Sequence, residues 1–230
     1  MISVCMATYN GGKYIDKQLS SILKQLDEND EIIISDDGSK DGTLDIINSF
    51  KDKRIHVFNN NGRQGVVPNF ENALTHAKGD IIILSDQDDV WADNKVSVIK
   101  EKLKNVDLVV HNSLLMDAKG NISDVDFFSL RHSGSGYLKN LYKNTFVGSC
   151  MAFKSILLKQ VLPFPKHILW HDMWIGLMAE KHRKTLFIPD CLLYYRRHGD
   201  NASATSEKSS FSIWKMISYR FWMMYYTLVR

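Results

Sequence analysis

Short apolar runs alternate with longer amphipathic stretches through the first half of the chain. The apolar runs are rich in Ile and Val and lack strict alternation, which is typical of strands covered on both faces of a parallel sheet. The pattern predicts strands at residues 2–7, 31–35, 54–58, 80–85 and 106–110, and helices at residues 14–26, 43–50, 66–77 and 94–103. This order predicts an α/β fold with a mostly parallel, doubly wound central sheet flanked by helices.

The regular alternation is lost after residue 110. Residues 111–136 are polar and contain scattered Gly and Ser, and mixed strand and helix signals follow. These signals predict a strand at 147–153, a helix at 170–180, short strands at 186–189 and 192–196, and a Ser-rich loop at 201–210. We expect residues 1–110 and 111–205 to form two halves of one domain, followed by an amphipathic aromatic helix at 206–230.

The composition excludes two classes of protein. The 230 residues are 44% hydrophobic, so the chain can bury a core and is not disordered throughout. Lys and Arg number 29 against 26 Asp and Glu, and this balance gives a net charge of +3. A protein that tracks nucleic-acid phosphates carries a stronger basic excess, so we expect no nucleic-acid partner.

The two ends of the chain bear on its location. The N-terminus lacks the basic region and cleavage site of a signal peptide, and no uninterrupted apolar stretch reaches the roughly 18 residues of a spanning helix. We therefore expect a cytoplasmic protein. Apolar residues recur at helical spacing in the tail at Phe211, Trp214, Ile217, Phe221, Met224, Tyr225 and Leu228. This stripe predicts either peripheral contact with the inner face of the cell membrane or packing against protein.

Three carboxylates follow the strand predicted at residues 80–85. Asp86, Asp88 and Asp89 lie within four residues, and they repel one another unless a cation lies among them. Hard carboxylate oxygens suit Mg²⁺ or Mn²⁺ better than zinc. A divalent ion that bridges to a diphosphate would explain the motif, and a solvated acidic turn is the alternative.

Polar loops also follow the other predicted strands. Ligands of doubly wound sheets bind outside the carboxyl ends of the strands, so loops on this edge favour one shared site. The first loop could hold a nucleoside, the second could accept hydrogen bonds from a base or ribose, and the third could contact a diphosphate. The first loop contains Thr8, Tyr9 and Asn10, the second contains Asp36 and Asp37, and the third contains Arg63. Taken singly, each loop is also an ordinary turn.

Five segments together resemble a known family, and they lie at residues 7–10, 36–43, 60–62, 77–80 and 86–89. They resemble the inverting, family 2 glycosyltransferases, which have the GT-A fold. Residues 85–91, followed by Lys95, are similar to bacterial rhamnosyltransferase-like members that build surface polysaccharides. The resemblance implies a GT-A type nucleotide-diphospho-sugar transferase fold, with a donor half at 1–110 and an acceptor-binding, catalytic half at 111–205.

The resemblance also implies roles for the acidic residues. Asp36 or Asp37 would contact the base or ribose, and Asp86 would contact the ribose. Asp88 would hold the divalent metal, Mn²⁺ or Mg²⁺, on the donor diphosphate, and Asp89 would support the loop.

Residues 170–174 open a predicted helix where the family has an acidic base. We expect Asp172 to be the general base, because inverting transfer needs a carboxylate to take the proton of the acceptor hydroxyl. His171 is the rival, since an unperturbed imidazole titrates near neutrality. An ordinary helix N-terminus, where Asp is favourable, is the alternative for both residues.

Residues 195–201 resemble a Tyr-Arg-x-His-x-x-Asn segment of the same subgroup. The resemblance implies that His198 is a second metal ligand and that Arg196 or Arg197 faces the charge of the leaving group. A basic surface loop is the alternative.

The expected function is metal-dependent inverting transfer of a sugar to a glycan or lipid-linked glycan acceptor of the cell surface. The donor would be a dTDP- or UDP-sugar, with rhamnose as the sugar of the narrower subgroup. The alternative is a catalytically silent scaffold that binds a nucleotide sugar. A phosphate-transferring hydrolase fits less well, because its nucleophilic aspartate usually follows the first strand, and this strand ends at Thr8 and Tyr9.

Overall fold

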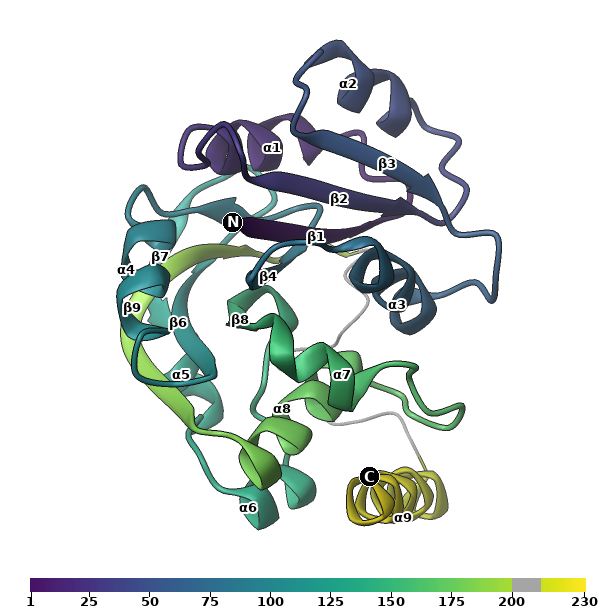
Figure 1. Cartoon of the computed structure of the whole chain (residues 1–230). Helices are drawn as coiled ribbons and strands as arrows, with labels where there is room; N and C mark the ends of the chain where they lie inside the picture. Colours follow the sequence, from purple (N-terminus) through teal and green to yellow (C-terminus); the bar gives the residue numbers. More distant parts are fainter. Residues whose placement is uncertain (200–211) are drawn as a thin grey trace.

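The computed structural model describes residues 1–199 and 212–230. Strands and helices alternate through the first half and form a sheet with helices on both faces (Figure 1). The parallel part of the sheet contains β1 (Ile2–Thr8), β2 (Glu31–Asp36), β3 (Ile55–Asn59) and β4 (Ile81–Asp86). The helices of this half are α1 (Ile15–Leu23), α2 (Thr43–Ser49), α3 (Val66–His76) and α4 (Lys95–Lys102). The α/β fold predicted from the sequence is confirmed.

The second half extends the same sheet with mixed strand directions. The strand order is β3-β2-β1-β4-β8-β6-β9-β5, and β7 pairs with β6 off this path. The added strands are β5 (Val90–Trp91), β6 (Leu108–Met116), β7 (Ile122–Asp126), β8 (Met151–Lys154) and β9 (Thr185–Arg196). Strand β8 lies antiparallel between β4 and β6, whereas β9 runs parallel to β6.

The central strands β1, β2 and β4 are buried on both faces, and their successive side chains point into two different cores. On β1, Val4 and Met6 pack with α1 and α2, whereas Cys5 packs with α3 and α8 (His171–His182) on the opposite face. The same alternation holds on β2, where Ile33 and Ile34 enter different cores. This double burial explains why the sequence shows continuous apolar runs rather than a polar–apolar alternation.

Two strands are longer than the sequence pattern predicts. β6 continues past residue 110 because its polar residues find partners: Asn112 Nδ2 donates to Asp126 Oδ1 at 2.7 Å, and His111 Nδ1 bonds the Asn112 carbonyl. The two short strands expected at 186–189 and 192–196 form one strand, β9, whose pairing with β6 shifts register near Asn112.

Short elements complete the second half. They are α5 (Phe127–Arg131), α6 (Tyr137–Tyr142), the 3₁₀ turns η1 (Gly148–Cys150) and η2 (Ser155–Leu157), and α7 (Leu158–Val161). The described part of the tail forms α9 (Ile213–Val229), which packs on α6 and α8 at the base of the molecule (Figure 1). The Ser-rich loop predicted at 201–210 and the start of the predicted tail helix, including Phe211, lie outside the described residues. Among residues 1–199 and 212–230, no helix is both long enough and apolar enough to cross a membrane.

Candidate functional site

The carboxyl ends of β1, β2 and β4 meet at one edge of the sheet. Thr8 pairs with Asp36 across the β1–β2 ladder, and Ala7 pairs with Asp86 across the β1–β4 ladder. The loops that follow these strands are therefore neighbours, as the parallel order requires.

Asp36 is buried and organises the loop that follows it. Its carboxylate accepts hydrogen bonds from the backbone N–H groups of Gly38 and Ser39, at 3.0 and 2.8 Å, and from the Thr8 hydroxyl at 3.0 Å. Gly38 has a φ of +85°, a conformation that favours glycine. The buried side chains of Thr8 and Asp36 thus fix the conformation of the loop at this edge of the sheet.

Asp37 joins this loop to the one after β3. Its carboxylate accepts from Asn60 Nδ2 at 2.9 Å and from the Gly65 N–H at 2.8 Å. Arg63, on the same loop, is largely exposed and lies 4.0 Å from Glu71. The structure therefore places Arg63 in the loop after β3 with its side chain largely open to solvent.

Tyr9 and Asn10 extend from the end of β1. Tyr9 is 56% exposed, and the side-chain amide of Gln87 accepts from the backbone N–H of Tyr9 at 2.9 Å and donates to its carbonyl at 3.0 Å. Asn10 accepts from the Lys40 N–H at 2.9 Å. Sequence reasoning missed Gln87, although its position between Asp86 and Asp88 was the available signal.

Asp88 and His198 come from distant parts of the chain and meet in the structure. His198 Nε2 lies 2.8 Å from Asp88 Oδ2, and both side chains are mostly buried. The His198 ring also lies 4.9 Å from the ring of Tyr14. The two residues that the sequence proposed as metal ligands are therefore neighbours.

Arg196 is a structural residue of the acidic loop. It is 2% exposed, its backbone N–H donates to Asp89 Oδ1 at 2.8 Å, and its Nε donates to the Asp88 carbonyl at 2.6 Å. Its guanidinium lies 4.7 Å from the Tyr14 ring centroid. Arg197 is exposed and its N–H donates to the Met116 carbonyl, so of the two arginines only Arg197 is open to solvent.

Asp172 lies in the first turn of α8. Its carboxylate accepts from the Met173 N–H at 2.6 Å and from Asn144 Nδ2 at 3.4 Å. Burial raises the pKa of Asp172 to about 6, and these hydrogen bonds oppose the rise. Burial, then the charges of Asp88 and Asp172, raise the pKa of Asp86 to about 7, so Asp172 lies within electrostatic reach of Asp86.

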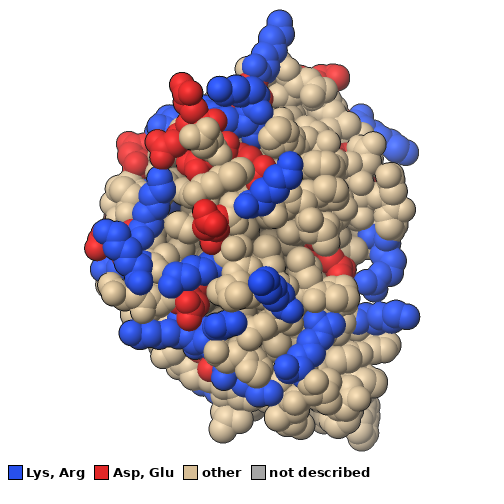
Figure 2. Space-filling view, in the orientation of Figure 1, with Lys and Arg blue, Asp and Glu red and all other residues tan. Residues whose placement is uncertain are grey.

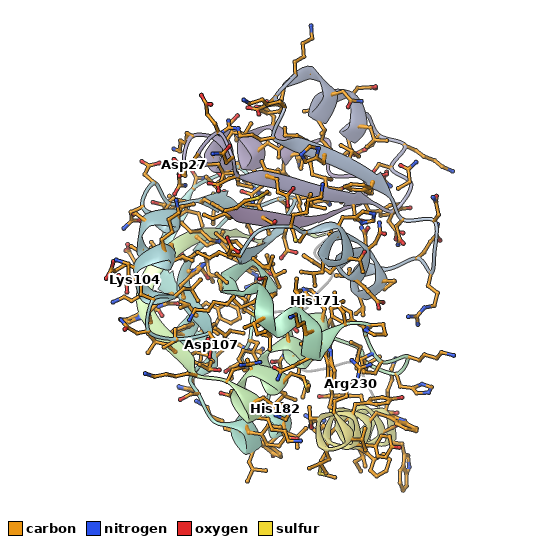
Figure 3. The ribbon with its side chains drawn as sticks, viewed as in Figure 1. Asp27, Lys104, Asp107, His171, His182 and Arg230 are labelled. Carbon is orange, nitrogen blue, oxygen red and sulfur yellow. The ribbon has the colours of Figure 1, made fainter. Side chains whose placement is uncertain are left out.

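His171, the rival base, points into the protein interior (Figure 3). Its ring stacks on Phe70 with the centroids 4.0 Å apart, and among the described residues no group pairs with its buried Nε2. Burial lowers the pKa of His171 to about 3. Its surroundings suit a neutral packing residue that supports the start of α8.

A buried lysine lies behind the carboxylates. Lys95 Nζ donates to the Ser149 carbonyl at 2.8 Å and lies 4.3 Å from the Trp91 ring centroid. Burial lowers the pKa of Lys95 to about 8, while the nearby carboxylates Asp86 and Asp89 raise it. Burial likewise raises the pKa of Asp89 well above its usual range. Lys95 belongs to the family-like segment, but the sequence alone assigned it no role.

The donor set at Asp88 and His198 fits a divalent ion that is shared with a ligand. In the described part of the chain, no group of three or more His, Cys, Asp or Glu side chains forms a complete metal site. Mg²⁺ and Mn²⁺ commonly take one or two protein ligands and complete their shell with phosphate oxygens and water. An oxygen and an imidazole nitrogen 2.8 Å apart suit this partial shell.

The chain is similar to known proteins over most of its length. A model of Glycosyl transferase family 2 matches residues 3–163. An uncharacterised glycosyltransferase of Nostoc sp. is 31% identical over 229 residues, which cover 91% of this chain and 70% of that protein. The GalNAc(5)-diNAcBac-PP-undecaprenol beta-1,3-glucosyltransferase of Campylobacter jejuni is 26% identical over 226 residues, which cover 93% of this chain and 70% of that protein.

Two solved structures share the fold. TarS from S. aureus, in complex with UDP-GlcNAc, has a TM-score of 0.68 and 19% identity, and the match covers 90% of this chain and 61% of that one. The mannosyltransferase PcManGT from Pyrobaculum calidifontis, in complex with GDP-Man and Mn²⁺, has a TM-score of 0.62 and 20% identity, with coverages of 84% and 56%. At these identities the likeness shows the fold alone.

Proposed function

This chain belongs to glycosyl transferase family 2, and from that premise we propose that it transfers a hexose from a UDP-sugar to a lipid-linked glycan with inversion. A UDP-sugar is favoured because two relatives from Escherichia coli, 42% and 36% identical over 97 and 106 residues, are named as UDP-Glc-dependent glucosyltransferases. A lipid-linked acceptor is favoured because the Campylobacter relative is named for an undecaprenol-linked glycan. dTDP-rhamnose, which the subgroup resemblance implies, is the competing donor.

One observation carries the proposal. Asp172, on the acceptor half, lies within electrostatic reach of Asp86, on the donor half, while Asp88 and His198 pair beside them. A proposed base and a proposed diphosphate site would thus face the same space from two sides of the sheet edge. Inverting transfer requires this geometry, because the acceptor hydroxyl must attack the anomeric carbon opposite the departing diphosphate.

Asp172 would act as the general base. It would take the proton of the acceptor hydroxyl as that oxygen bonds the anomeric carbon and the bond from this carbon to the diphosphate oxygen breaks. A pKa near 6 suits a base that works near neutral pH, since the carboxylate is ionised there but retains proton affinity. The hydrogen bonds from Met173 and Asn144 would hold the carboxylate in one orientation.

The donor half of the site would bind the leaving nucleoside diphosphate. Asp88 and His198 would hold Mn²⁺ or Mg²⁺, which when bound neutralises the charge of the departing nucleoside diphosphate. Arg197 and Arg63 would add positive charge from the rim. The Tyr9 ring and the loop built by Asp36 and Asp37 would form the nucleoside site, with Asp86 near the ribose.

Thermal unfolding with UDP, dTDP or GDP, each with and without Mn²⁺, tests the donor site. A ligand that binds the native state alone stabilises it by about 2.7 kcal/mol at a hundred times its Kd. We expect a metal-dependent rise in melting temperature with UDP and its loss in Asp88→Ala. The variant should keep a normal melting transition without ligand.

The matched control is Asp93→Ala, which removes an exposed carboxylate close to the motif. This control should keep the UDP shift. An assay of free UDP then distinguishes a transferase from a silent scaffold. A transferase should release UDP from a UDP-sugar when a lipid-linked acceptor is added. A protein that binds UDP with metal but releases none would count against transfer, and an Asp88→Ala variant with an unchanged shift would remove Asp88 from the metal site.

A further inference from the structure

Helix α9 carries a row of apolar side chains that face away from the protein. Trp214 is 81% exposed, and its neighbours at helical spacing are also exposed. The row consists of Trp214, Ile217, Phe221, Met224, Tyr225 and Leu228. With 3.6 residues per turn these side chains fall on one face of the helix, which we call the α9 stripe.

The orientation of the stripe is fixed by packing on the opposite face of α9. Met223 and Thr227 are fully buried, and the Thr227 side chain pairs with the Tyr137 hydroxyl of α6. Lys181 of α8 donates to the Thr227 carbonyl. The stripe therefore points outward because other side chains of α9 are anchored.

Helix α6 extends the same apolar surface. Leu138 and Tyr142 are 75% and 78% exposed, and Arg220 of α9 donates two hydrogen bonds to the Tyr142 carbonyl, at 2.9 and 2.7 Å. Helices α6 and α9 lie together at the base of the molecule (Figure 1). Together, Leu138, Tyr142 and the α9 stripe form one exposed apolar face, here called the basal face.

Basic residues border the basal face. Residues 127–230 contain fifteen Lys and Arg against five Asp and Glu, whereas residues 1–126 contain fourteen against twenty-one. Neither α6 nor α9 contains an acidic residue, and the basic residues in and beside them are Lys139, Lys143, Lys215, Arg220 and Arg230. Figure 2 shows Lys and Arg spread over the lower half of the molecule, above a base that is largely uncharged.

We propose that the basal face docks on an anionic lipid bilayer. Exposed Trp, Tyr and aliphatic side chains with flanking Lys and Arg are the features of helices that lie in a membrane interface. Charge complementarity favours lipid over a second copy of this chain. A symmetric dimer through this face would bring two basic borders together, and like charges repel.

The basal face lies beside the segment that leads to Asp172. His167, four residues before His171, stacks on Trp222 of α9 with ring centroids 4.7 Å apart. A groove of about 290 Å³ is lined by residues 166–169 and by α9, and Lys166 and Lys215 are among its lining residues. A membrane-bound protein would thus hold the start of α8 near the lipid headgroups. This docking goes beyond the proposed transfer reaction and does not depend on it.

Flotation with vesicles tests the proposal on the full chain. We expect binding to vesicles of equal parts phosphatidylcholine and phosphatidylglycerol and little binding to phosphatidylcholine alone. Ile217→Ser/Leu228→Ser should lower the partition coefficient at least tenfold, because each side chain loses apolar burial in the interface. Lys143→Gln/Lys215→Gln should lower it about fivefold per charge, the equivalent of about 1 kcal/mol for each basic residue.

The matched control is Ile122→Ser/Val125→Ser, which removes two similarly exposed aliphatic side chains from β7. This control should bind vesicles like the wild type. Equal binding to both vesicle types, no binding to either, or equal losses in the control and the α9 variant would overturn the proposal. A wild-type dimer in sedimentation velocity that Ile217→Ser/Leu228→Ser makes monomeric would instead assign the face to a second copy. The UDP-dependent melting shift should persist in all these variants, so failure here is distinct from failure of the transferase proposal.

Discussion

Asp172 is held in an environment that disfavours its charge. Burial raises its pKa from 3.8 to about 6, and the same cause acts on Asp86 next to it in the site. A carboxyl group with a raised pKa is more stable in the folded protein when it is protonated. The free energy of unfolding that this group contributes is fully present below pH about 4 and is lost as pH rises through about 6.

We therefore expect Asp172→Asn to lose transferase activity and to gain stability at pH 8. The gain should be about 1–3 kcal/mol, because each pKa unit corresponds to about 1.4 kcal/mol and partial solvation reduces the full amount. The amide oxygen of Asn can still accept from Met173 and Asn144. Urea unfolding at pH 8 and pH 4 measures the difference, which should vanish at pH 4.

Asp190→Asn is the control for this prediction, since Asp190 is exposed and lies far along the chain on β9. Its stability should match the wild type at both pH values. A lower stability of Asp172→Asn at pH 8 would contradict the assigned cost of burial. In the wild type, kcat/KM should fall below pH about 6 as Asp172 becomes protonated.

The neighbouring strands β1 and β4 are packed closely at their starts. A Cβ on Gly79 would lie 2.6 Å from the Ser3 nitrogen and 2.8 Å from the Ile2 carbonyl carbon. Gly79 N also donates to Ser3 Oγ at 2.7 Å. Both obstructing atoms belong to the backbone of β1, which is fixed by parallel pairing to β2 and β4 and cannot move aside.

Gly79→Ala should therefore destabilise the protein by about 1–3 kcal/mol, the usual effect of forcing extra atoms into a packed interior. Thermal or urea unfolding measures it. Gly62→Ala is the matched control, because the nearest atom to its Cβ would be the Asn60 side-chain oxygen at an ordinary 3.5 Å. A Gly79→Ala variant as stable as the control would show that the backbone of β1 can shift to accommodate the added methyl group despite its pairing.

The two halves of the chain share one sheet and one pair of cores. Strand β8 of the second half covers the edge of β4, and the core beside α1 contains Ala152 and Leu193 as well as Ile2 and Val4. Separating the halves would expose the apolar side chains and the unpaired backbone groups of β4. We therefore expect the two halves to unfold as one cooperative unit.

A fragment of residues 1–110 should consequently fail to fold on its own. We expect it to show no cooperative urea transition and to aggregate through the exposed β4 edge, whereas the full chain unfolds in one transition. Near-ultraviolet circular dichroism and analytical ultracentrifugation measure the two properties. A monomeric fragment with a sharp transition would show that the donor half is an independent domain.

The sequence by itself determined the alternating strands and helices of the first half. It also located the polar loops with Asp36, Asp37, Asp86 and Asp88. Hydrophobic periodicity reports which faces of an element are buried, and a parallel sheet brings the strand ends together, so these features follow from local pattern and topology.

Only the tertiary structure decided the rest. The insertion of β8 between β4 and β6, the direct hydrogen bond between Asp88 and His198 and the burial of His171 all depend on contacts between distant segments. The sequence pattern did not predict the second part of β6, because this part contains polar residues whose hydrogen-bond partners lie elsewhere in the chain. The local pattern shows whether a side chain is buried or polar, but the packing of the whole chain decides which residue it contacts. The sequence alone therefore did not predict the positions of Lys95, Gln87 and Arg196.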